Sequence, residues 1–294
     1  MKIIITGSLG NISKPLAIQL ITKGHNVTVV SSNADKTAEI NQLGAQAAIG
    51  SVSDESFLTE TFTGADLLYL MVPTDFSATD LRGYIKSVGQ HYANALKASG
   101  VKKVILLSSI GAHLDKGTGP IAGLHDVEQI LNQFNDIDLL TLRPSFFYNN
   151  FYANIDLIKH AGIIGSNYGA DQPIVLVHPT DIAAVAASKV EEGFEGKSIQ
   201  YIASDKVKLS EVASALGSAI GKADLPWVEF DDTQAYEGMV GAGLSTEMAR
   251  NYVEMGTAIR SELLWEDFEA KGIVPVGKIK LKDFAAQFAV AYNG

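Results

Sequence analysis

The chain has 294 residues and is 47% hydrophobic, which suits one large α/β domain or a core domain with a smaller lobe. It contains no cysteine, so disulfides, thiolate nucleophiles and cysteine-bound zinc are excluded. With a net charge of -10, no basic cluster and no apolar stretch of membrane-spanning length, we expect a cytoplasmic protein that binds neither nucleic acid nor membranes.

Short apolar segments alternate with helical patterns through the first half of the chain. The predicted strands are residues 2–6, 26–30, 45–49, 66–71, 103–107 and 138–142. Helical patterns separate them, including residues 34–43, a long helix that ends at Ser99-Gly100 and one from about His125 to Phe134. Strands separated by helices pair in parallel through right-handed crossovers, so the sequence predicts an α/β fold with a Rossmann-type doubly wound parallel sheet.

The pattern changes after Arg143-Pro144, where apolar strands become rarer and helical stretches dominate. We therefore predict a Rossmann domain over residues 1–146 and a smaller C-terminal α/β substrate lobe over residues 147–294, with soft boundaries and room for the chain to interleave. His178 and Asp181 are three residues apart, but no third ligand accompanies them, so no metal site is predicted.

A glycine-containing turn follows the first predicted strand and precedes the first helix. Glycine allows a tight turn at this point, and a second glycine lets the backbone approach a pyrophosphate that lies on the helix N-terminus. The position in the first βα turn, with five more strands behind it, favours a dinucleotide site over a plain structural turn. The predicted contacts are Gly7, Ser8, Leu9, Gly10, Asn11 and Ile12.

The end of the second strand bears on the choice between NADP(H) and NAD(H). An acidic residue there would bind the ribose 2′-hydroxyl and repel a 2′-phosphate. The chain instead has Ser31, Ser32 and Asn33, followed by Lys36. Hydroxyls, an amide and a lysine suit a phosphate, so NADP(H) is the preferred cofactor and NAD(H) stays open as the alternative.

With these elements placed, the chain resembles the NmrA-like group of atypical short-chain dehydrogenase/reductases over nearly its whole length. The resemblance rests on the order of several modest motifs. These are the glycine turn, Gly64-Ala65-Asp66, the segment 98–103 leading to Ser108-Ser109, His125 with Glu128, the segment 142–150 (LRPSFFYNN), and Asp181-Ile182-Ala183.

The resemblance implies a Rossmann domain with a smaller substrate lobe, and an NAD(P)H-dependent reductase of quinones or azo compounds. Other members of the group bind NAD(P) as redox sensors without known turnover. The chain departs from the group in three ways: Ser13 replaces the usual third glycine, Ser32 replaces a frequent arginine, and Glu128 follows His125 after two residues rather than three. The first departure weakens helix packing, and the last turns Glu128 by about 100° on its helix.

No tyrosine has a lysine four residues later, so the classical short-chain dehydrogenase mechanism is excluded. Hydride transfer to a quinone needs less from the protein, because the cofactor carries the hydride. The catalytic candidates are His125, since histidine titrates near neutral pH, and Ser109, which ends the fifth strand beside Ser108. Both serines are also candidates for binding the nicotinamide ribose.

The remaining candidates follow the fourth and sixth strands. Met71, Val72 and Pro73 are predicted on the adenosine side of the cofactor, and Pro144 and Phe146 also beside the cofactor. Phe147, Tyr148 and Asn150 are predicted to contact a flat acceptor.

The leading interpretation is an NADPH-dependent reductase of a small-molecule acceptor, and a homodimer is compatible with it. A non-catalytic NAD(P) sensor is the alternative, and a nucleotide-sugar epimerase ranks last because its chemistry normally needs the absent tyrosine–lysine pair.

Overall fold

The larger sheet has seven strands in the order β3-β2-β1-β4-β5-β6-β10, and all neighbouring strands pair in parallel. The computed structural model describes residues 1–294. The strands are β1 (Lys2–Ile5), β2 (Asn26–Ser31), β3 (Gln46–Ile49), β4 (Leu67–Leu70), β5 (Lys103–Leu107), β6 (Asp138–Pro144) and β10 (Lys197–Ile202). The strand order reverses between β1 and β4, where open α/β sheets bind ligands. This topology confirms the predicted Rossmann-type sheet.

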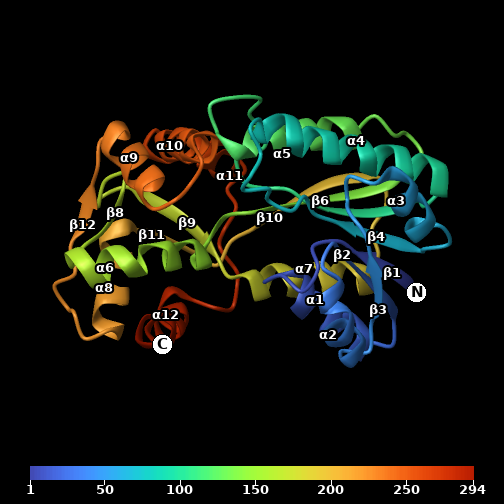
Figure 1. Ribbon diagram of the computed structural model, residues 1–294, viewed down its shortest axis with the longest axis horizontal. Coiled ribbons are helices and arrows are strands. Elements are labelled where there is room, and N and C mark those ends of the chain that lie inside the picture. The colour runs from blue at the N-terminus through green and yellow to red at the C-terminus, as the bar shows by residue number, and fades with distance from the viewer.

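Helices cover both faces of this sheet, as the apolar strands require. Ile3 and Ile5 of β1 point into one core and Ile4 points into the other, because successive side chains of a strand alternate between faces. The first face is covered by α1 (Ser13–Thr22), α2 (Thr37–Gln42) and α7 (Pro179–Glu192), and the second by α3 (Glu55–Phe62), α4 (Leu81–Ser99) and α5 (Pro120–Leu131). Figure 1 shows the two helical layers below and above the sheet.

The C-terminal lobe lies at the other end of the molecule (Figure 1) and has its own core of 26 buried residues. One small sheet has the order β11-β9-β7 and the other pairs β12 with β8. The strands are β7 (Phe146–Phe147), β8 (Ile164–Ser166), β9 (Pro173–Val177), β11 (Asp205–Lys208) and β12 (Trp227–Glu229). The helices are η2 (Tyr148–Asn154), α6 (Ile155–Ala161), α8 (Leu209–Ala219), α9 (Asp232–Gly241), α10 (Thr246–Arg260), η3 (Leu263–Trp265), α11 (Glu266–Ala270) and α12 (Leu281–Asn293).

The chain passes between the two parts more than once. After β9 it returns to the large sheet, where α7 packs beside α1 and β10 extends the sheet next to β6. A division of the chain at residue 147 stays a prediction, and α7 and β10 show that the second half also contributes to the large sheet. None of the helices combines the length and apolar character that a membrane crossing requires.

Two predicted helices differ from those observed. The helix before β6 begins at Pro120 and not near His125, because proline suits the first helical turn and the positive φ of Gly119 directs the chain into it. His125 therefore lies in the second turn. Residues 34–43, predicted as one helix, form a short 3-10 helix, η1 (Ala34–Lys36), before α2, where the Asn33 side chain accepts from the Asp35 amide.

Candidate coenzyme site

The turn between β1 and α1 has a shape that requires glycine at residue 7. Gly7 has φ of 95°, and a Cβ atom there would lie 2.7 Å from both Met71 Sδ and Ser13 Oγ. Ser8 follows with φ of 54°, a rare value for a residue with a side chain. Two successive left-handed residues therefore bend the chain sharply from the strand into the helix.

Several backbone N–H groups of this turn have no partner within the protein. Leu9, Asn11 and Ile12 donate no hydrogen bond to any protein acceptor. Ile12 caps α1 without a side-chain hydrogen bond, and the first turn of the helix has no acidic residue. Free amides at the positive end of a helix suit an anion such as a pyrophosphate, so the turn fits the group that the sequence predicts there.

Ser13, which replaces the usual third glycine, makes a hydrogen bond of its own between α1 and the end of β1. Its side chain is buried, and its hydroxyl donates to the Thr6 carbonyl oxygen at 2.9 Å. This hydrogen bond fastens the helix to the strand at the point where a glycine would have allowed close contact.

The end of β2 is tied to the glycine turn. Ser31 and Ser8 are joined by a hydrogen bond between their hydroxyl oxygens at 2.9 Å, and the Ser8 amide donates to the Val30 carbonyl. Ser32 and Asn33 are exposed beyond the strand end. No carboxylate occupies the strand end itself, the position from which an acidic residue binds the ribose 2′-hydroxyl of NAD(H).

The end of β4 closes over the same turn. The Met71 amide donates to Thr6 Oγ1 at 2.8 Å, and the Tyr92 hydroxyl donates to the Met71 carbonyl at 2.6 Å. Val72 and Pro73 continue from Met71 and line a cavity of about 100 Å³ with residues of α4, α5 and α10. The Met71–Pro73 segment is therefore anchored at the edge of the sheet, beside Gly7.

The two serines after β5 differ in availability. Ser108 is buried, and its hydroxyl donates to Glu128 Oε1 at 2.5 Å. Ser109 is partly exposed, and its hydroxyl donates only to the neighbouring Ile110 carbonyl. Of the two, Ser109 has the hydroxyl that a ligand at this edge can reach.

Glu128 belongs to a buried charged network that the sequence analysis missed. The Arg143 guanidinium donates to both carboxylate oxygens of Glu128, at 3.0 and 2.6 Å, and to the Tyr201 hydroxyl at 2.9 Å. Tyr201 donates in turn to Asp267 of α11. Arg143 of β6 thus holds the Glu128 carboxylate inside this network, and the predicted turn of Glu128 away from the position usual in the group stays a prediction.

The environment of Arg143 keeps it charged. Burial alone would lower the pKa of Arg143, but its hydrogen bonds and ionic contact with Glu128 outweigh burial and raise that pKa above its ordinary value. The network thus joins the ends of β5, β6 and β10 to α11 in the C-terminal lobe.

His125 is partly buried on α5, and its orientation is fixed by the loop after β5. Its Nδ1 atom lies 2.9 Å from the Ala112 carbonyl oxygen. A carbonyl only accepts, so Nδ1 carries the proton in this contact and Nε2 is left for another partner. The contact of Nδ1 therefore fixes the ring and leaves Nε2 available to a ligand.

The aromatic segment after β6 splits between two environments. Phe146 and Phe147 are partly exposed, Pro144 before them is buried, and Asn150 is exposed. Tyr148 is fully buried, stacks on Phe284 at 5.1 Å between ring centroids, and donates to Asp205 Oδ2 at 2.5 Å. Tyr148 is a core residue with no exposed surface that a substrate could contact. The prediction that it contacts the acceptor is therefore wrong.

A Tyr148→Phe variant tests this placement. Removing the hydroxyl leaves the Asp205 carboxylate with one donor fewer, and we expect the free energy of unfolding to fall by about 1.5–3 kcal/mol. The Michaelis constant for an acceptor should stay within about twofold of wild type. Urea unfolding followed by circular dichroism checks the first value and steady-state kinetics the second. A large rise in the Michaelis constant with unchanged stability would show instead that Tyr148 contacts the substrate.

Many of the predicted cofactor residues follow the carboxyl ends of the parallel strands, while His125 lies on α5 and Lys36 on η1. The glycine turn and the ends of β2, β4 and β5 meet at one edge of the sheet because parallel strands end on the same side. Their individual contacts with a coenzyme stay predictions. No group of three or more histidine, aspartate or glutamate side chains is arranged to hold a metal ion.

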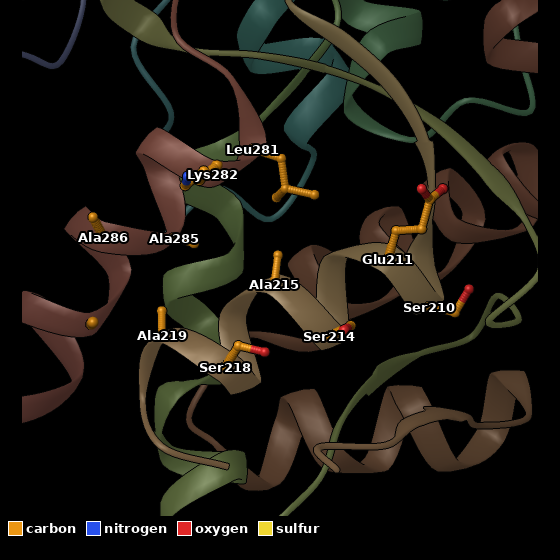
Figure 2. Close-up of a pocket in the computed structure, with 11 residues that line it drawn as sticks. Ser210, Glu211, Ser214, Ala215, Ser218, Ala219, Leu281, Lys282, Ala285 and Ala286 are labelled. Atoms are coloured by element: carbon orange, nitrogen blue, oxygen red, sulfur yellow. The ribbon is translucent and has the colours of Figure 1, made fainter. Parts of the chain in front are cut away.

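A groove of about 1080 Å³ lies elsewhere, between α8 and α12 of the C-terminal lobe. Figure 2 shows Ala215 and Ala219 on the side of α8 toward α12, which contributes Leu281, Ala285 and Ala286 to the lining. None of the predicted site residues lines this groove, so it is separate from the candidate coenzyme site.

Comparison with known proteins gives the site a context. The family model described as NAD(P)H-binding matches residues 7–161, which begin at the glycine turn. The NAD(P)H azoreductase of Xenophilus azovorans is 23% identical over 248 residues, which cover 84% of this chain and 83% of that protein.

Two solved structures share the fold over almost the whole chain. The Citrobacter sp. triphenylmethane reductase complexed with NADP(H) superimposes with a TM-score of 0.79 and 20% identity, over 97% of this chain and 99% of that one. The Escherichia coli NADPH-dependent quinone oxidoreductase complexed with NADPH gives a TM-score of 0.75 and 20% identity, over the same shares of the two chains.

Proposed function

The chain belongs to the NAD(P)H-binding family, and on that premise we propose that it is an NADPH-dependent reductase, which transfers a hydride to a quinone, an azo dye or a related small-molecule acceptor. The observation that carries the proposal is the glycine turn at the switch point of the sheet. There the backbone amides of Leu9, Asn11 and Ile12 have no protein acceptor and lie at the N-terminus of α1. Its similarity to an azoreductase, a triphenylmethane reductase and a quinone oxidoreductase supports the acceptor class.

Each group at the sheet edge has a task in this reaction. The turn amides bind the diphosphate, and the anchored Met71–Pro73 segment supports the adenosine side. Ser109 offers a hydroxyl to the nicotinamide ribose. The bound coenzyme supplies the hydride, while the protein fixes its orientation against the acceptor and excludes water. Doubly protonated His125 gives its Nε2 proton to the reduced acceptor and keeps the Nδ1 proton toward the Ala112 carbonyl, so that hydride and proton together complete the reduction.

The proposal predicts turnover that can be followed by the absorbance of NADPH. Purified protein should oxidise NADPH when a panel of quinones, azo dyes and triphenylmethane dyes is supplied, and it should do so faster than with NADH at the same concentration. Failure to oxidise either coenzyme with any acceptor, despite tight coenzyme binding, would contradict the proposal and favour the non-catalytic sensor.

His125→Ala should lower kcat on the order of tenfold, the low end for general acid–base catalysis, because the hydride comes from the coenzyme. The dissociation constant for NADPH should not change. His160→Ala is the matched control, since His160 Nδ1 makes a similar contact with the Asp156 carbonyl at 2.8 Å but lies on exposed α6. If both variants keep wild-type turnover, His125 has a structural role only and does not donate the proton.

A homodimer and a cytoplasmic location, both compatible with the sequence, stay predictions. Gel filtration with light scattering measures the first, and fractionation of the source cells measures the second.

A further inference from the structure

Two lysines from different elements share one carboxylate at the corner between α1 and α2. Lys14, in the first turn of α1, places its Nζ atom 2.8 Å from Glu39 Oε1. Lys36, at the end of η1, places its Nζ atom 3.0 Å from Glu39 Oε2. The two ammonium groups therefore lie close together, one on each oxygen of the Glu39 side chain.

This corner adjoins the place where a Rossmann site holds the adenosine ribose. Lys14 directly follows Ser13, and its amide donates to the Gly10 carbonyl of the glycine turn at 3.0 Å. Lys36 comes four residues after Ser32, which is exposed just beyond the end of β2. The ribose 2′ position of a bound dinucleotide lies at the end of β2, and the two lysines come from the elements on either side of it along the chain: Lys14 from α1 before β2 and Lys36 from η1 after it.

Lys14, Lys36 and Glu39 together carry a net positive charge, and the exposed Asp35 directly precedes Lys36 in η1. Hydrogen bonds from Lys14 and Lys36 hold the pKa of Glu39 below its ordinary value, so this carboxylate stays ionised at neutral pH. Two ammonium groups and one carboxylate leave one positive charge. A phosphate monoester has about two negative charges and three acceptor oxygens, which is enough to take a hydrogen bond from each lysine.

We propose that Lys14 and Lys36 together bind the 2′-phosphate of NADPH, and that Glu39, which competes with the phosphate for both lysines, sets the preference for NADPH over NADH. The inference rests on the proposed use of NADPH. It explains how the site recognises a phosphate although Ser32 stands where an arginine is frequent: the positive charge comes from α1 and η1 instead. All three side chains are partly exposed, with 41%, 44% and 38% of the Lys14, Lys36 and Glu39 side chains accessible, so a phosphate can reach them.

Calorimetric titration of the whole protein with NADPH and with NADH tests the proposal without any acceptor. Lys14→Met and Lys36→Met should each raise the dissociation constant for NADPH about tenfold, as expected for a lost hydrogen bond to a charged group, and leave that for NADH unchanged. Glu39→Gln should lower the dissociation constant for NADPH about threefold or more, because it removes both the competitor and a repelling charge.

Lys206→Met is the matched control. Lys206 also forms an ion pair between two elements, with Glu269 at 2.7 Å and similar exposure, but on β11 and α11. This variant should bind both coenzymes as the wild type does. Thermal unfolding of each variant verifies that the fold is kept.

Two outcomes would overturn the inference. Equal weakening of NADPH and NADH by Lys14→Met would place that lysine on the diphosphate, and unchanged NADPH binding in all three variants would reduce the cluster to an ordinary surface ion pair. Turnover of the wild type with an acceptor is measured separately. The assignment of the lysines can therefore be wrong even if the wild type reduces an acceptor. A protein that reduces no acceptor can still lose NADPH binding selectively when either lysine is replaced.

Discussion

Replacing Arg143 with methionine should lower the free energy of unfolding by about 3–5 kcal/mol, the largest stability effect that we expect of any single substitution of a charged residue in this chain. Arg143 and Glu128 are only 4% and 2% exposed, and two hydrogen bonds join them. Removing the guanidinium leaves the Glu128 carboxylate buried with Ser108 as its remaining donor. Urea unfolding followed by circular dichroism measures the change.

Arg82→Met provides the matched control. Arg82 binds Asp126 through a bidentate pair of hydrogen bonds, at 2.8 and 3.0 Å, as Arg143 binds Glu128, but the Arg82 side chain is 43% exposed. Water screens such a pair, so its loss should cost no more than about 1 kcal/mol. The double variant Arg143→Met/Glu128→Leu should recover much of the lost stability, because no buried charge is left unpaired. A cost for Arg143→Met as small as that for Arg82→Met would show that the network does not support the fold.

Gly10→Ala should raise the dissociation constant for NADPH on the order of 100-fold while the fold is kept. Gly10 has an ordinary backbone conformation, and a Cβ atom there would meet only the Gly7 carbonyl oxygen, at 3.1 Å. The Gly7 carbonyl oxygen has to shift by a few tenths of an ångström to admit the methyl group, whereas a diphosphate lying against the backbone is displaced by it. A 100-fold change corresponds to about 2.7 kcal/mol, which the loss of one hydrogen bond to a charged group, at about 1.5–3 kcal/mol, accounts for.

Gly238→Ala on exposed α9 is the control for this variant, because a Cβ atom at Gly238 meets nothing within 4 Å. Thermal unfolding should give both variants a stability within about 1 kcal/mol of wild type. Calorimetry then measures coenzyme binding. Wild-type affinity of the Gly10→Ala protein for NADPH would place the diphosphate away from this turn.

The large sheet could be predicted from the sequence because its signals are local. The strand over residues 103–107 is observed with the predicted bounds, since a buried parallel strand is a continuous apolar run between a helix end and a turn. The glycine turn is equally local: the required backbone shape at Gly7 is encoded by the residue itself.

The C-terminal lobe and the polar network could not be predicted in this way. β8 and β12 have three residues each, lie far apart in the sequence and pair with each other. Strands this short show no recognisable alternation of apolar and polar residues in the sequence. The sequence places Arg143 in a family motif but does not predict its buried ion pair. Its partners Glu128, Tyr201 and Asp267 come from three other elements that are distant in the sequence. Tyr148 resembles a ligand-binding aromatic until Asp205 and Phe284 are found around it.

The central claim is that the turn between β1 and α1 binds the diphosphate of NADPH. A crystal structure of the protein with NADPH is the most direct measurement. Diphosphate oxygens should lie about 2.7–3.2 Å from the backbone nitrogens of the turn, chiefly those of Leu9, Asn11 and Ile12. A diphosphate bound elsewhere on the protein, or crystals without coenzyme at millimolar NADPH, would contradict the account.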